Sequence, residues 1–265
     1  MLFRSGANVP GWEGAIRFGK GEFAVAEVDE SDKSLVAFSP YAAVVTNASA
    51  DHYSKEEMDE VFDAFVKDCS GPVIDARGEV YRPQDFNRQN ASLAIRMAVA
   101  LGCDRAEAER AMESFGGVER RLQRYGARVY DDYAHNPEKL RAMWLALAEE
   151  HPDGICVVWR PHGYAPLRKM MDALASAFAE VVRPQDRLLL LPVYDAGGTT
   201  DRSVNSGDLA RKMEASGCAS PELVSDLDAA YGWMLAHRGE YAAFVTAGAC
   251  DPGLPVLASR LAAAL

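Results

Sequence analysis

Carboxylates, an imidazole and an amide gather at three places in this sequence, each after an apolar run that is typical of a strand. The first is AEVDESD, which carries Glu27, and the second is TNASADH, which carries His52. The third is YDDYAHNPEKL, which carries Asp132 and His135 and follows the run ARVY. Open α/β sheets bind ligands where strands end and helices begin. All three stretches are therefore candidate parts of a binding or catalytic site.

Glu27 and His52 are candidate metal ligands. Carboxylates and an imidazole at the ends of two neighbouring strands could hold a divalent cation with its waters, and Mg²⁺ needs few protein ligands of this kind. The alternative is a solvated acidic turn followed by an ordinary helix cap at Asp51. Taken alone, these residues favour the alternative.

Two further clusters lie at expected helix starts. In FNRQN, residues 86–90, helix capping is again the favoured alternative. In DDYAHNP, Asp132 and His135 could position a nucleophile or bind a charged substrate, exposed in a cleft. Asp131 or Asn136 would then cap the helix that begins at a proline.

The elements expected before residue 117 are mixed. We expect strands at 22–28 and 41–47 and a hairpin at 71–85. A helix is expected at 54–69, opened by Ser54 and Glu57 at capping-box spacing. Two more helices are expected at 90–103 and 104–115.

After Gly116 and Gly117 the pattern restarts. Strands expected at 127–132, 154–160, 186–194 and 240–248 are each followed by a helix, at 137–150, 167–181, 206–215 and the C-terminus. Continuous apolar strands that alternate with helices predict a parallel sheet covered on both faces. The predicted fold class is therefore α/β, with a partial α/β domain at 1–116 and a complete Rossmann-like parallel-sheet domain at 117–265.

Composition limits the classes of partner. The chain of 265 residues carries a net charge of −11, which argues against nucleic acid or an anionic membrane as partner. It shows no apolar run of membrane-spanning length, and its first residues lack the apolar core of a signal peptide. Its five cysteines are scattered and never in CxxC spacing. They indicate reduced packing residues of a cytoplasmic protein.

Taken in chain order, these clusters resemble those of a known family. The succession AEVDESD, VVTNASADH, NRQNASLAIRMAVALG, GVERRLQRYG and DDYAHNPEKL is similar to that of the Mur ligases, the ATP-dependent amide-bond ligases of peptidoglycan assembly. The later stretches RPHGYAPLR, LLLLPVYDAGG and TAGACDPG are similar to their C-terminal domain. Within the family, the alanine-adding branch is the most similar.

The resemblance implies ATP and Mg²⁺ as cofactors. Glu27 and His52 match ligands of a Mg²⁺ ion near the acyl-phosphate chemistry. Asn90 matches an asparagine that binds adenine, with Arg88 on the basic position beside it. Arg121 matches an arginine near the ATP phosphates.

The resemblance also implies the substrates. Asp132 and His135 match a motif that lies over the nucleotide and the amino acid, and His162 and Arg168 fall in a substrate-binding stretch. In the implied reaction, ATP phosphorylates the carboxylate of UDP-N-acetylmuramate. The amine of L-alanine, or of a related amino acid or peptide, then attacks the acyl phosphate. A metal ion and an arginine would offset the charge that builds on the transferring phosphoryl group.

The sequence departs from the family in several places. It contains no G-x-x-G-K-[ST] phosphate loop, and Met1 falls well inside the family's central domain. Gln89 stands in place of a histidine, and Gly163 and Pro166 stand where alanine-adding ligases have arginines. We therefore expect a fragment of such a ligase that does not turn over ATP by itself. The alternative is a non-catalytic binding or regulatory module.

Overall fold

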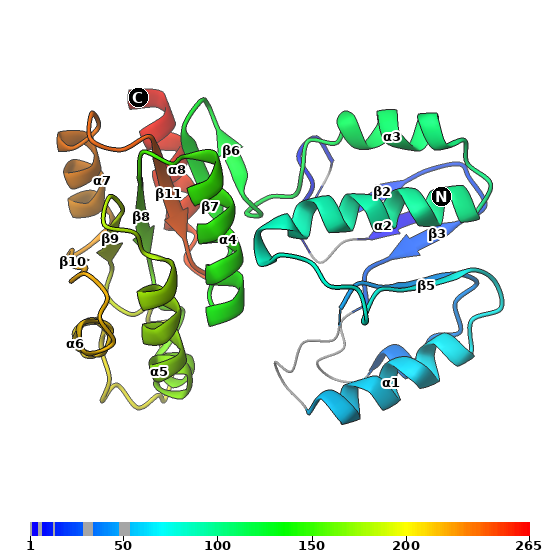
Figure 1. The fold of residues 1–265 in the computed structure, drawn as a ribbon, viewed down its shortest axis with the longest axis horizontal. Coiled ribbons are helices and arrows are strands. Elements are labelled where there is room, and N and C mark those ends of the chain that lie inside the picture. The colour runs from blue at the N-terminus through cyan, green and yellow to red at the C-terminus, as the bar shows by residue number, and fades with distance from the viewer. Residues whose placement is uncertain (1, 5–6, 13, 29–33, 48–53) are drawn as a thin grey trace. The chain divides into compact units, whose positions relative to one another are not determined.

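The computed structural model describes residues 2–4, 7–12, 14–28, 34–47 and 54–265. The chain forms two compact units, Met1–Val118 and Glu119–Leu265 (Figure 1). The first is the N-terminal unit and the second is the C-terminal unit. No helix in the described ranges is long and apolar enough to cross a membrane.

The C-terminal unit is built on one six-stranded sheet with the order β10-β9-β8-β11-β7-β6. The strands are β6 (Gln123–Tyr125), β7 (Val129–Asp132), β8 (Ile155–Trp159), β9 (Arg187–Leu190), β10 (Glu222–Leu223) and β11 (Ala243–Ala247). All neighbouring strands pair in parallel except β6, which is antiparallel to β7. The predicted parallel sheet is therefore confirmed, with an antiparallel edge strand that was not predicted.

Helices cover both faces of this sheet (Figure 1). One face packs against α4 (Pro137–Glu150), α5 (Tyr164–Val181) and α6 (Ser206–Ala215). The other packs against α7 (Leu227–Ala236) and α8 (Gly253–Ala264). The three layers explain why the strands read as continuous apolar runs. In β8, Ile155, Val157 and Trp159 face the first set of helices, whereas Cys156 and Val158 face the second.

Local signals set the helix starts. Asn136 caps α4 by accepting a hydrogen bond from the Lys139 N–H, and Pro137 occupies the first helical position. Asn205 and Asp208 form a capping box at α6. The predicted ranges of these two helices are confirmed. Helix α5 begins three residues earlier than predicted, and α7, capped by Asp226, was not predicted.

The N-terminal unit contains two small sheets. Strands β1 (Leu2–Arg4), β2 (Ile16–Phe18) and β3 (Ala24–Ala26) form a sheet with the order β2-β1-β3. Strands β4 (Ala43–Val45) and β5 (Val73–Asp75) form a parallel pair. The helices are α1 (Lys55–Lys67), α2 (Phe86–Ala100) and α3 (Arg105–Glu113), with short 3₁₀ turns η1 (Ser34–Ala37) and η2 (Pro83–Asp85).

Two expectations for this unit are wrong. Residues 71–85 do not form a hairpin, because β5 pairs with β4, which lies before α1 in the chain. The strands expected at 22–28 and 41–47 are not neighbours. Within the described residues, β3 and β4 belong to different sheets.

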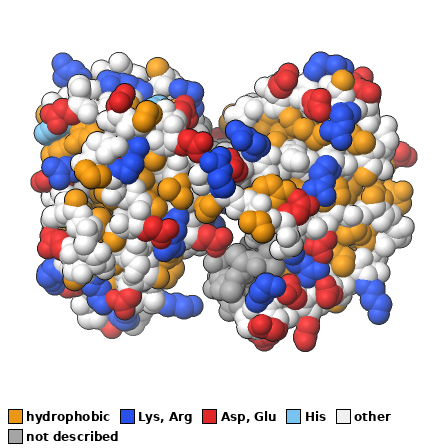
Figure 2. Space-filling view, in the orientation of Figure 1, with side chains coloured by type: hydrophobic (Ala, Val, Ile, Leu, Met, Phe, Trp, Pro, Cys, Tyr) orange, Lys and Arg blue, Asp and Glu red, His pale blue; other side chains and the backbone are white. Residues whose placement is uncertain are grey.

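In its described part, the N-terminal unit has one small buried cluster and several exposed apolar side chains. Ile74, Ala76 and Leu93 form its buried cluster. Phe18 is 83% exposed and Val80 is 97% exposed, and Figure 2 shows hydrophobic side chains among charged ones on the visible surface. Among the described residues, most of the buried apolar ones lie in the C-terminal unit.

Candidate functional site

Polar residues of the C-terminal unit gather at the carboxyl ends of three adjacent strands, β8, β11 and β7. Asp132 is the last residue of β7, and His135 lies three residues beyond it. Arg160 and His162 follow β8, and Asp251 follows β11. Parallel strands present these ends at one edge of the sheet, where α/β folds bind ligands. The C-terminal unit thus brings together residues of three quoted stretches, DDYAHNPEKL, RPHGYAPLR and TAGACDPG.

His135 and His162 lie against each other at this edge. Their ring centroids are 4.8 Å apart with an interplanar angle of 71°. His135 Nδ1 is 3.0 Å from the Tyr133 carbonyl oxygen, which can accept a hydrogen bond from it. Burial, and secondly the neighbouring His135, lower the pKa of His162 to about 4. His162 is therefore neutral at pH 7.

Asp132 is buried, with 4% of its surface exposed. One carboxylate oxygen accepts the Leu122 N–H at 2.7 Å and the other accepts the Ala134 N–H at 2.8 Å. Burial raises the pKa of Asp132 to about 6, against the opposing effect of these N–H groups and of the Arg121 charge. The expectation that Asp132 is an exposed polar group is therefore wrong. The backbone around it closes over its oxygens.

Arg121 is exposed, whereas the side chain of the adjacent Arg120 is fixed by hydrogen bonds. The Arg120 Nε donates to Asp131 Oδ2 at 2.8 Å, and its Nη2 donates to the Gly248 carbonyl oxygen. Asp131 also accepts the Thr246 hydroxyl at 2.6 Å. Asp131 therefore pairs with Arg120 rather than capping α4. Arg120 was not a predicted site residue, although its position one residue before Arg121 was a signal.

Other arginines at this edge are bound by carboxylates. Arg168, a predicted substrate-binding residue, pairs with Asp201 at 2.8 Å and donates to the Ser203 hydroxyl at 3.2 Å. Arg160 pairs with Asp251 at 2.7 Å. This second pair was not predicted, although its residues lie in the stretches RPHGYAPLR and TAGACDPG.

The predicted nucleotide-binding residues of the N-terminal unit lie on α2. Asn90 is exposed, and Arg88, with 84% of its side chain exposed, lies 3.6 Å from Asp85. Residues two apart on a helix do not face each other, so Arg88 and Asn90 lie on different faces. Gln89 donates to the Thr46 carbonyl oxygen at 3.2 Å.

The predicted metal ligands are described only in part. Glu27 is exposed directly after β3 and offers the oxygen ligand that Mg²⁺ prefers. His52 lies outside the described residues. Within the described ranges, no three His, Cys, Asp or Glu residues come together as a metal site. The pairing of Glu27 with His52 stays a prediction.

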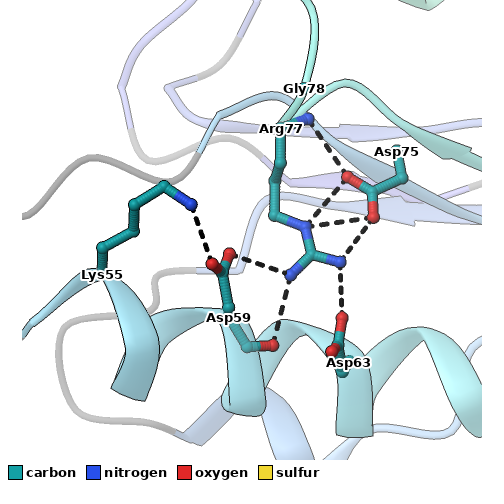
Figure 3. A pocket seen from close by; sticks show the side chains of 6 residues that line it. All are labelled: Lys55, Asp59, Asp63, Asp75, Arg77 and Gly78. Atoms are coloured by element: carbon teal, nitrogen blue, oxygen red, sulfur yellow. Dashed lines mark hydrogen bonds and ion pairs between the residues drawn. The ribbon is translucent and has the colours of Figure 1, made fainter.

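An open pocket of the N-terminal unit lies between α1 and the end of β5 (Figure 3). The Arg77 guanidinium lies at its centre, 2.6 Å from carboxylate oxygens of Asp63 and Asp75 and 3.3 Å from one of Asp59. Lys55 pairs with Asp59 at 2.9 Å. The hydrogen bonds from Arg77 lower the pKa of Asp75. The two cations pair with the three carboxylates and tie β5 to α1. None of these residues was a predicted site residue.

The family follows from comparison of the chain with known proteins. The model of the Mur ligase glutamate ligase domain matches residues 118–250, half of the chain. The chain belongs to the Mur ligase family.

Its relatives define the similarity further. A UDP-N-acetylmuramate–L-alanine ligase of Sinorhizobium medicae is 27% identical over 317 residues, covering 93% of this chain and 66% of the relative. A ligase of the same description from Rubrobacter xylanophilus is 33% identical over 239 residues, covering 68% of this chain and 53% of the relative. The chain thus spans about half to two thirds of the length of these relatives.

Solved structures share the fold. A UDP-N-acetylmuramate–alanine ligase of Thermotoga maritima has a TM-score of 0.74 at 21% identity, covering 98% of this chain and 67% of that chain. A folylpolyglutamate synthase/dihydrofolate synthase of Yersinia pestis, complexed with AMPPNP and a Mn ion, has a TM-score of 0.58 at 13% identity. It covers 91% of this chain and 66% of that one. These likenesses establish the α/β fold.

Proposed function

We propose that this chain is the nucleotide- and amino-acid-binding part of an ATP-dependent carboxylate–amine ligase of peptidoglycan precursor synthesis. The reaction joins L-alanine, or a related amino acid or peptide, to UDP-N-acetylmuramate through an acyl phosphate. The observation that carries the proposal is the match of residues 118–250 to the family, together with the polar edge formed after β7, β8 and β11 in that range.

Each proposed residue has a role in this reaction. Asn90 and Arg88 bind the nucleotide base region, and Glu27 and His52 hold Mg²⁺, which offsets phosphate charge. Arg121 contacts the phosphates. His135 and neutral His162 accept or donate hydrogen bonds to the incoming amino acid, beside Arg168. Asp132 orders the backbone of the site rather than exchanging a proton with substrate, because both of its oxygens accept backbone N–H groups.

The test has two arms. The chain alone, given ATP, UDP-N-acetylmuramate and L-alanine, should form no product, because a phosphate loop supplies N–H groups and a lysine that this sequence lacks. The same chain should form ADP, dependent on all three substrates, when co-expressed with the part of the Rubrobacter xylanophilus ligase that it does not match. A folded, UDP-sugar-binding assembly that forms no ADP would contradict the proposal.

A non-catalytic binding module is the second candidate, favoured by Gly163 and Pro166, which stand where alanine-adding ligases have arginines. Both candidates predict Mg·ATP binding, and only the ligase predicts turnover in the co-expressed assembly. Replacing Asn90 by Ala should weaken Mg·ATP binding, measured by calorimetry. The matched control is Asn87→Ala, which removes another exposed asparagine from the same helix and should leave the affinity unchanged.

A further inference from the structure

Arg120 and Leu122, on either side of Arg121, have a backbone conformation that residues with side chains rarely adopt. Arg120 has a φ of 58° and Leu122 a φ of 47°. Each such residue is disfavoured by roughly 1 kcal/mol or more and persists only where its surroundings hold it. Two of them flank Arg121, so strong contacts must fix this segment.

The side chain of Arg120 supplies one set of contacts. It bonds Asp131 and the Gly248 carbonyl oxygen, and its guanidinium lies 5.0 Å from the centre of the Tyr133 ring. The Asp131 side chain is fully buried and is fixed in turn by Thr246. Arg120 is thereby tied to the ends of both β7 and β11.

The backbone supplies the second set. The Tyr133 N–H donates to the Arg120 carbonyl oxygen at 2.7 Å. The Leu122 N–H donates to the Asp132 carboxylate at 2.7 Å. Backbone groups on both sides of Arg121 are therefore bound to the strand end.

Arg121 differs from both neighbours. Its side chain is exposed, and no hydrogen bond or ion pair joins it to another residue in the described part of the chain. Arg120, Arg160 and Arg168 all pair with carboxylates. The segment thus immobilises the backbone around one arginine and leaves its guanidinium available for an anion.

We propose that Arg120 and Asp131 are a positioning pair, which fixes residues 120–122 and thereby presents the Arg121 guanidinium to a phosphate group of the nucleotide. The pair itself does not touch the nucleotide. This inference rests on the proposed function for the identity of the anion, whereas the fixing of the segment stands on the contacts alone.

The chain offers a matched control pair. Arg183 and Asp186 are also 2.8 Å apart, with a fully buried carboxylate, in the same unit. Asp186 binds the Trp144 indole N–H and the Ile155 N–H, remote in sequence from residues 120–122. Asp131→Asn and Asp186→Asn therefore each remove the charge of a buried carboxylate that pairs with an arginine. Only the first should act on Arg121.

The experiment measures amide hydrogen exchange by NMR and Mg·ATP affinity by calorimetry in the whole chain. Asp131→Asn should raise the exchange rates of the Leu122 and Tyr133 amides by about tenfold or more, and Asp186→Asn should not. Arg121→Gln should leave exchange unchanged. Asp131→Asn and Arg121→Gln should each weaken Mg·ATP binding by about tenfold to a hundredfold, as expected for one lost charge-assisted hydrogen bond. Asp186→Asn should preserve the affinity.

Three results would contradict the proposal or one of its parts. If Leu122 exchange does not respond to Asp131→Asn, or responds equally to Asp186→Asn, the pair does not position the segment. If exchange rises while only Arg121→Gln weakens binding, presentation of Arg121 does not depend on the pair. Should Asp131→Asn fail to fold, amide exchange and Mg·ATP affinity are measured in Arg120→Lys and Thr246→Val instead, with the same expected results. A wild-type chain that binds no Mg·ATP contradicts the proposed function. The exchange rates of the Leu122 and Tyr133 amides then test by themselves whether the pair fixes residues 120–122.

Discussion

Asp131 and Asp132 are adjacent in β7 but have different environments. Successive residues of a strand point to opposite faces, so the two carboxylates lie on opposite sides of the sheet. Burial raises the pKa of both, and for Asp131 the charge of Arg120 opposes the rise. Their place at a strand end was predictable from the run ARVYDD. Their burial was not, because it depends on residues 120–122 folding back over β7.

Asp132 should make stability fall as pH rises. Its folded-state pKa of about 6 lies above the ordinary value of 3.8, so the folded protein binds more protons than the unfolded chain between these values. The stability from this group is fully present below pH 3.8 and is lost as pH rises through 6. The unfolding free energy of Asp132→Asn, relative to wild type, should therefore increase by roughly 1 kcal/mol between pH 5 and pH 7.5. Urea denaturation at each pH measures it.

Asp186→Asn is the control for this effect. Burial raises the pKa of Asp186, but hydrogen bonds from Arg183, Trp144 and Ile155 outweigh it and lower the pKa. This carboxylate is ionised in both the folded and the unfolded state above pH 5, so the difference between Asp186→Asn and wild type should stay constant from pH 5 to 7.5. A flat difference for Asp132→Asn as well would show that its pKa is not raised.

His162 should remain neutral well below the usual range of histidine. Its imidazole resonances in NMR should titrate with a midpoint near pH 4. In His135→Ala the midpoint should rise only partway towards 6.5, because burial is a larger cause than His135. A midpoint above 6 in the wild-type chain would mean that the ring is open to solvent.

Local sequence signals were enough to predict some helices and strands but not others. Helices α4 and α6 were predicted to the residue because caps and a proline define their first turns. Strand β5 was misread as half of a hairpin, because its partner β4 lies across α1 and no local pattern encodes that pairing. Helix α7 was not predicted because it is short and contains Gly232, which disfavours a helix. Asp226 at its start was nevertheless a cap signal.

The capping box of α1 should contribute measurably to the stability of the N-terminal unit. The Ser54 hydroxyl accepts the Glu57 N–H at 3.2 Å, and the Glu57 carboxylate accepts the Ser54 N–H at 3.3 Å. This predicted box is confirmed. Ser54→Ala should destabilise the N-terminal unit by about 1 kcal/mol. Thermal or urea unfolding followed by circular dichroism would measure this, and Ser54→Asp, which retains the cap, should restore stability.

The whole molecule divides unevenly between its two units. The C-terminal unit has two extensive cores, one on each face of its sheet, whereas the buried cluster of the N-terminal unit is small. We expect the C-terminal unit to fold on its own. Brief chymotrypsin treatment should cleave after Phe115, which is 44% exposed, and leave a resistant fragment that begins near residue 116. Phe115→Ala should slow its release, and failure to accumulate any such fragment would contradict the expectation.

The contact between Arg120 and Gly248 also bears on the order of folding. It joins residues that are 128 apart in sequence, so forming it requires closure of a long loop, and we expect it to form late, after β7 and β11 have paired. Interactions that are absent from the transition state affect the unfolding rate and leave the folding rate nearly unchanged. Arg120→Lys should therefore accelerate unfolding in stopped-flow denaturant jumps while the refolding rate stays the same. The segment that presents Arg121 would then be among the last parts of the C-terminal unit to become ordered, and among the first to open.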